Sequence, residues 1–224
     1  MIVPAMNKME IKAEIKRDLA KICKSTLPRL AAEYDRERRK LKIEKSNDYS
    51  KIYCIKTGSK NKWMIFVKKA AAKTKYLQAS DATYFTVVYY YTKDGFNACR
   101  INGANEDLEF FYGHFFSRYN ERQQLNLPDT LSAVKHFFNN NEGFNTLFRQ
   151  LKKEAAPKGT TFVESVCDLG LALGLYYLDT KHIIYKTFIS KHLLTKSQRL
   201  IEEELKETYC CEETDDEVLT TVAA

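Results

Sequence analysis

Residues 110–122 read Phe-Phe-Tyr-Gly-His-Phe-Phe-Ser-Arg-Tyr-Asn-Glu-Arg, and the rest of the chain can be arranged around this stretch. The pattern predicts a helix that starts near Gly113. His114, Arg118 and Arg122 are spaced four residues apart, so they share one stripe of that helix. Aromatic side chains occupy the adjoining face. One imidazole and two guanidinium groups are therefore expected at the edge of a packed aromatic surface, as in a half-buried site.

Strand-like segments lie on both sides of this stretch. Residues 83–92 are β-branched and aromatic almost throughout, which is typical of a β-strand. Asp94-Gly95 follows and is a strong hairpin signal. The same criteria predict shorter strands at 49–56, 62–69, 96–102, 161–167, 170–178 and 183–189. Two helices are predicted within residues 130–154, one on each side of Asn139–Gly143, and a last helix at 193–208.

Two further helices are expected at the N-terminus. Residues 7–27 show the apolar spacing of an amphipathic helix, and Pro28 suits the start of a second helix after a break at 25–28. The second helix carries a dense group of bases, namely Arg36, Arg38, Arg39 and Lys40. These side chains form either the solvated face of a packing helix or an arm that docks on nucleic acid.

The order of helices and strands predicts the α+β class, because the regular βαβ alternation of a parallel sheet is absent. We expect an N-terminal helical pair, an antiparallel sheet with central helices packed on it, a C-terminal helix and an acidic disordered tail. The corresponding domain boundaries are 1–46 for the helical arm, 47–207 for the core domain and 208–224 for the tail.

Charge is distributed unevenly along the 224 residues. The net charge is +7, but residues 202–224 contain nine acids and one lysine, so the preceding part carries +15. A basic body predicts an anionic partner such as a nucleic acid. The sequence has no apolar run of membrane-spanning length and no signal-peptide pattern, so we expect a cytoplasmic protein without a membrane partner. The six cysteines are expected to be buried thiols.

The stripe at 114–122 suits phosphodiester chemistry. A histidine near neutral pH can give or take a proton, and paired arginines can hold a phosphate. Tyr119 could stack on a base. We find no zinc-ligand spacing and no phosphate-binding glycine loop, so no metal and no cofactor is predicted. Alternatively, Arg118 and Arg122 form ordinary surface pairs with neighbouring acids.

The His-x-x-x-Arg-x-x-x-Arg spacing at His114, Arg118 and Arg122 resembles the helix motif of RelE/BrnT-type toxins, which are small metal-independent bacterial ribonucleases. The late strand containing Thr187 resembles the terminal strand that completes their site. The resemblance implies a helix lying on an antiparallel sheet and cleavage of RNA through the 2′-hydroxyl. It also implies a catalytic set of His114, Arg118, Arg122 and Thr187, and a possible neutralising protein partner.

Three functional hypotheses follow. The first is a toxin-like or mobile-element ribonuclease in which His114 is the acid/base and the two arginines clamp phosphate. The second is a non-enzymatic RNA- or DNA-binding module that uses the basic second helix and an aromatic platform made of Tyr84, Phe85, Tyr89 and Tyr91. The third is a protein–protein adaptor whose basic face meets an acidic partner.

Overall fold

The computed structural model describes residues 1–40, 50–69, 82–101, 107–141, 145–149, 156–200 and 203. The chain forms two compact units. The first comprises Met1–Gly113 and Thr180–His182, and the second comprises His114–Asp179 and Ile183–Ala224.

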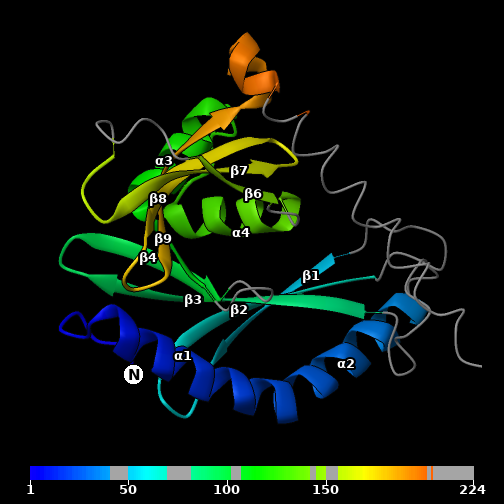
Figure 1. Ribbon diagram of the computed structural model, residues 1–224. Helices are drawn as coiled ribbons and strands as arrows, with labels where there is room; N and C mark the ends of the chain where they lie inside the picture. The colour runs from blue at the N-terminus through cyan, green and yellow to red at the C-terminus, as the bar shows by residue number, and fades with distance from the viewer. Residues whose placement is uncertain are drawn as a thin grey trace, which may run out of the picture. The chain divides into compact units, whose positions relative to one another are not determined.

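An antiparallel meander forms the sheet of the first unit (Figure 1). Its strands are adjacent in the order β1-β2-β3-β4-β5, and each pairs in antiparallel fashion with the next. Tight turns join β1 to β2 and β3 to β4, and Gly95 has the positive φ of 110° that the second turn requires. The strands are β1 (Ser50–Lys56), β2 (Lys62–Lys69), β3 (Ala82–Thr92), β4 (Gly95–Ile101) and β5 (Leu108–Tyr112).

Two helices lie along one face of this sheet (Figure 1). They are α1 (Lys8–Lys21) and α2 (Leu27–Lys40). Asn7 and Glu10 cap the start of α1 reciprocally. The prediction of a break at 25–28 is wrong, because a π-helical segment, η1 (Ile22–Thr26), carries the backbone from α1 into α2. The apolar stripes of both helices are buried.

The second unit places two helices and a β-strand around an aromatic core. Its elements are α3 (Gly113–Arg122), α4 (Thr130–Asn140), β6 (Asn145–Arg149), β7 (Thr160–Cys167), β8 (Gly170–Tyr177), β9 (His182–Ser190) and η2 (Lys191–Leu193). The strands are adjacent in the order β9-β8-β7-β6. Phe137 of α4 packs edge-on against Phe115 and Tyr119 of α3, with centroids 5.1 and 5.0 Å apart. Phe188 of β9 contacts Tyr119 at 5.0 Å.

Two glycines of β8 allow the backbone of β9 to approach closely. A Cβ atom at Gly170 would lie 2.0 Å from the Ile189 carbonyl oxygen, and one at Gly174 would lie 2.5 Å from that of Ile184. These distances explain the Gly-x-x-x-Gly spacing as a backbone contact between strands.

The α+β class is confirmed, with the N-terminal helical pair, the start of the central helix at Gly113 and a short helical segment at 196–200. Two predictions are wrong: residues 108–112 form a strand that was not expected, and 145–149 form β6 where a helix was expected. Cys99 and Cys167 are buried as predicted, whereas Cys23 and Cys54 are exposed. The predicted boundary at 46 and the tail at 208–224 lie outside the described residues. No described helix is long and apolar enough to cross a membrane.

Candidate nucleic-acid interface

The three residues of the predicted catalytic stripe lie on α3. His114 is exposed at the start of α3. Arg118 donates from Nη1 to Glu121 Oε2 at 2.8 Å, and the two side chains are 44% and 65% exposed. An exposed pair of this kind contributes about 0–1 kcal/mol. The alternative of an ordinary surface pair therefore describes Arg118 well.

Arg122 fastens the end of α3 to β9. Its Nη1 donates to Thr187 Oγ1 at 3.2 Å and to the Phe188 carbonyl oxygen. In return, Ser190 Oγ donates to the Arg122 carbonyl oxygen at 2.9 Å. The structure thus brings together two members of the predicted catalytic set, Arg122 and Thr187. The guanidinium group of Arg122 finds its hydrogen-bond acceptors within the chain.

Tyr119 lies in the aromatic core. It is 0% exposed, and its hydroxyl lies 2.7 Å from His136 Nδ1. Burial raises the pKa of Tyr119 and lowers the pKa of His136. A fully buried ring has no face to offer a base, so in this position Tyr119 holds α3 to α4.

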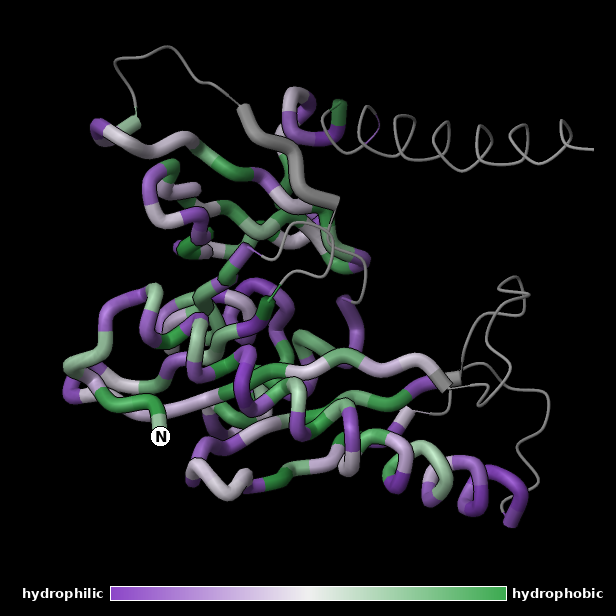
Figure 2. The backbone as a smooth tube through the Cα atoms, turned by 60° about the horizontal axis from the view of Figure 1, so that its bottom comes forward, coloured by the Kyte–Doolittle hydropathy of each residue, from purple (hydrophilic) through white to green (hydrophobic). Residues whose placement is uncertain are grey.

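The predicted basic group on α2 is mostly exposed. Arg36, Arg39 and Lys40 face solvent, while Arg38 is half-buried with its guanidinium carbon 5.9 Å from the Tyr34 ring centroid. The hydrophilic colour dominates the last turns of α2 (Figure 2). These side chains are therefore placed to meet an anion, with Arg38 anchored by packing.

Two of the three acids of α2, Glu33 and Glu37, pair with a lysine of the sheet. Lys51 of β1 donates to Glu33 Oε1 at 3.0 Å and to Glu37 Oε2 at 2.6 Å. Burial opposes the charge of Lys51, but the hydrogen bonds to Glu37 and Glu33 prevail and raise its pKa. One lysine of the sheet thus offsets part of the negative charge of two acids that would otherwise weaken the positive field of the helix further.

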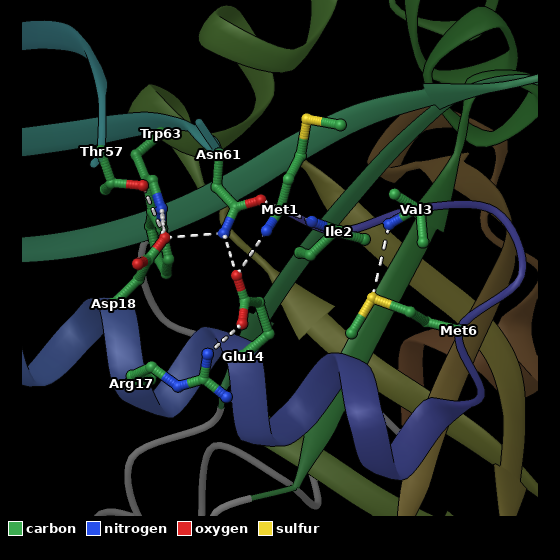
Figure 3. Close-up of polar contacts among 10 residues, drawn as sticks. All are labelled: Met1, Ile2, Val3, Met6, Glu14, Arg17, Asp18, Thr57, Asn61 and Trp63. Carbon is green, nitrogen blue, oxygen red and sulfur yellow. Dashed lines mark hydrogen bonds and ion pairs between the residues drawn. The ribbon is translucent and has the colours of Figure 1, made fainter. Parts of the chain in front are cut away.

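Two acids of α1, Glu14 and Asp18, are buried still more deeply, and Figure 3 shows their polar contacts. Asp18, which is 0% exposed, accepts at Oδ2 from Thr57 Oγ1 (2.7 Å), Asn61 Nδ2 (2.7 Å) and Trp63 Nε1 (3.2 Å). Burial alone would raise the pKa of this carboxyl, but the hydrogen bonds from Asn61, Thr57 and Trp63 outweigh burial and lower it. Glu14 is the second buried acid.

Glu14 joins the same network. Its Oε1 accepts from Asn61 Nδ2 at 3.2 Å and from the amino group of Met1 at 2.7 Å (Figure 3). The hydrogen bond from the amino group is the main cause that lowers the pKa of Glu14. Arg17 contacts Glu14 Oε2 at 2.9 Å while its side chain stays 62% exposed. The network therefore holds two of the three carboxylates of α1, those of Glu14 and Asp18, inward and ionised.

A one-sided charge distribution results over residues 11–40. All five acids of this segment are buried or half-buried. We call its exposed bases the basic helical surface, which consists of Lys16, Arg17, Lys21, Lys24, Arg29, Arg36, Arg39 and Lys40. Glu10, in the first turn of α1, is an exposed acid outside this segment. Over residues 11–40 the fully exposed charges are all bases, so this segment presents a positive field to a partner.

The aromatic strand does not form the predicted single platform. Side chains alternate along β3, so Tyr84 lies on one face of the sheet and Phe85, Tyr89 and Tyr91 lie on the other. Phe85 stacks on Phe66 with centroids 4.4 Å apart. Tyr84 and Tyr91 are 50% and 58% exposed. The four rings therefore cannot bind one strand of nucleic acid together.

Comparison with protein-family models, with curated proteins and with solved structures gives no match for this chain. Its function must be inferred from its own residues. Within the described residues, no group of three or more His, Cys, Asp or Glu side chains is arranged to hold a metal ion.

The contribution of α1 to the basic surface was not predicted from the sequence. The available signal was the position of Glu14 and Asp18, four residues apart and adjacent to the apolar stripe of Ile11 and Ile15. Acids on the buried side of an amphipathic helix leave an excess of positive charge on its outer side.

Proposed function

We propose that this protein binds nucleic acid through the basic helical surface. The observation that carries the proposal is the segregation of charge on α1 and α2, with eight bases exposed and every acid of residues 11–40 buried or half-buried. A stripe of lysine and arginine on one face is the electrostatic signature of phosphate-backbone binding. The proposal includes RNA as the preferred partner and a cytoplasmic location.

The dimensions of the surface suit a duplex. From Lys16 to Lys40 the helical path is roughly 36 Å at 1.5 Å per residue. That length corresponds to about ten base pairs at 3.4 Å each. Residues 10–40 expose no large hydrophobic side chain, so bases have nothing to stack on there. The surface should therefore bind duplexes through their phosphates, with little dependence on sequence.

The test compares two variants of matched charge. One replaces Lys16, Lys21, Arg36 and Arg39 of the basic helical surface with glutamine. The control replaces four exposed lysines of the second unit with glutamine, namely Lys158, Lys186, Lys191 and Lys196. Fluorescence anisotropy with a labelled duplex in about 50 mM salt should show a large loss of affinity for the first variant alone. An equal loss of affinity in both variants would mean that only the net charge of the protein matters, and would contradict the proposal.

A ribonuclease activity is a second candidate, favoured by the contact between Arg122 and Thr187. Its test is cleavage of a mixed-sequence RNA in EDTA, with wild type beside His114→Ala. Cleavage by wild type alone, leaving a cyclic-phosphate end, is the result this candidate predicts. If the protein binds the RNA but does not cleave it, only the binding function is supported. A toxin of this type would also have a neutralising protein partner.

The third hypothesis, an adaptor for an acidic protein, predicts a different result when duplex binding is measured at several salt concentrations. An adaptor shows no nucleic-acid affinity that falls steeply with salt, whereas a phosphate-binding surface does.

A further inference from the structure

We infer that the first unit has a second nucleic-acid contact, a site for an unpaired base at Tyr91 and Lys62, on the face of the sheet opposite α1 and α2. This inference rests on the proposed function, because it adds a single-strand site to a protein that binds duplex phosphates. It concerns different residues on the other side of the same sheet.

The strand register places these residues on one face. Lys56 of β1 is opposite Lys62 of β2, and Lys62 is opposite Tyr89 of β3. Tyr91 of β3 is opposite Phe96 of β4. Directly opposed residues of antiparallel strands project from the same side of the sheet, and so do residues two apart on one strand. All five side chains therefore share a face near the end of the sheet.

That face is not the one α2 covers. Tyr84 of β3 is opposite Val67 of β2, which is opposite Lys51 of β1. Lys51 pairs with Glu33 and Glu37 of α2. Tyr84 therefore shares the face along which α2 lies. Tyr91 is an odd number of residues further along the same strand, so its side chain projects from the opposite face.

The local chemistry suits an unpaired nucleotide. Tyr91 is 58% exposed, and its ring meets Phe96 edge-on with centroids 5.4 Å apart, which fixes its orientation. The ammonium of Lys62 lies 5.8 Å from the Tyr91 ring centroid. Lys56 and Lys62 are both exposed. An exposed aromatic ring beside ammonium groups provides base stacking and phosphate neutralisation together, as in proteins that bind single strands.

The turns at this end add charge of the same sign. The antiparallel meander brings the β1–β2 and β3–β4 turns to one end of the sheet. Lys60 in the first turn and Lys93 in the second are exposed, and Asp94 is the exposed acid there. The positive charge around Tyr91 favours a polyanion over a neutral aromatic ligand.

The first experiment measures affinity for a single-stranded oligonucleotide and for a duplex of the same length. Tyr91→Ala should weaken single-strand binding by about fivefold to a hundredfold, the usual effect of one base–aromatic stack, and leave duplex binding unchanged. Tyr91→Phe keeps the ring and should retain the affinity. Tyr84→Ala is the matched control, since it removes an exposed ring of the same strand from the other face.

The outcomes separate the two proposals. Unchanged single-strand affinity in Tyr91→Ala, or an equal loss in Tyr84→Ala, with duplex binding intact, overturns this inference alone. If wild type binds neither oligonucleotide, the proposed function fails and the inference fails with it.

Two native thiols give an independent readout. Cys54 of β1 is exposed on the same face as Lys56 and Lys62, while Cys23 is exposed in η1 between α1 and α2. Alkylation with a small maleimide can be followed for each thiol by mass spectrometry of its peptide. A single strand should slow alkylation of Cys54, and a duplex should slow that of Cys23. Protection of Cys23 alone by both oligonucleotides would overturn the site at Tyr91.

Discussion

The buried carboxylate of Asp18 should be the strongest single polar contribution to the first unit. Asp18→Ala removes the acceptor of three hydrogen bonds, from Thr57, Asn61 and Trp63. Asn61 and Trp63 are 4% and 1% exposed, so water cannot replace the lost acceptor. Each buried donor left unsatisfied costs about 1–3 kcal/mol. We therefore expect a loss of about 3–5 kcal/mol, a large part of the roughly 5–15 kcal/mol typical of a domain.

The assay has a built-in reporter. The chain has one tryptophan, Trp63, whose indole N–H donates directly to Asp18. Urea unfolding followed by its fluorescence therefore reports on the first unit. Asp94→Asn, which alters an exposed carboxylate, should change stability by less than about 0.5 kcal/mol. A loss below about 1 kcal/mol in Asp18→Ala would refute the argument that this network holds α1 against the sheet.

The pH dependence gives a second check on the same residue. Because the folded-state pKa of Asp18 is lowered, its ionised form stabilises the fold above the unfolded-state value of about 3.9. That stabilisation is lost as the pH falls through the lower folded-state pKa. Asp18→Asn cannot ionise, so the gap in stability between it and wild type should narrow below about pH 4. A gap that stays constant from pH 7 to pH 3 would contradict this assignment.

Three further predictions concern stability. Gly170→Ala should lower the melting temperature sharply, since a Cβ there would lie 2.0 Å from a carbonyl oxygen. Gly58→Ala should not, because a Cβ at Gly58 would have nothing within 4 Å. Equal melting temperatures of the two variants would contradict this prediction. Arg122→Ala should cost about 1–3 kcal/mol in urea unfolding, against about 0–1 kcal/mol for Arg118→Ala, and the reverse order would refute the assigned roles. Burial, together with the charge of a neighbouring lysine, lowers the pKa of His182 to about 4. Stability should therefore fall as pH drops from about 6.5 toward 4, and His182→Gln should reduce this dependence to the part that the lowered pKa of His136 contributes.

Much of the fold could be predicted because it depends on local patterns. The run of β-branched and aromatic residues at 83–92 forms β3 (Ala82–Thr92), and Asp94-Gly95 forms its turn. The apolar stripe of residues 7–27 forms α1 and η1. In each case the periodicity or the turn residue determines the backbone without help from distant contacts.

The errors arose where tertiary contacts decide the structure. Residues 108–112 and 145–149 are short segments whose sequence suits a helix or a strand equally. Pairing with β4 makes the first of them β5, and pairing with β7 makes the second β6. A strand can gain its hydrogen bonds only from a neighbour, and the sequence does not show which neighbour it has.

The candidate site was likewise only partly predictable from the sequence. The bases of α2 could be read from the sequence, but their isolation from acids could not, because it depends on Lys51 and the β1–β2 turn. The spacing of His114, Arg118 and Arg122 was equally visible. Arg122 bonds to Thr187 of β9 and Arg118 to Glu121 of its own helix, because β9 packs beside the end of α3.

The measurement that tests the central claim most directly is the salt dependence of duplex DNA binding by wild type and by the variant with glutamine at Lys16, Lys21, Arg36 and Arg39. Each phosphate contact contributes about 0.9 to the slope of log K against log salt. If all four bases contact phosphate, the slope should become shallower by about 3–4 units, and the control variant of the second unit should keep the wild-type slope. Identical slopes in wild type and the surface variant would contradict binding through the basic helical surface.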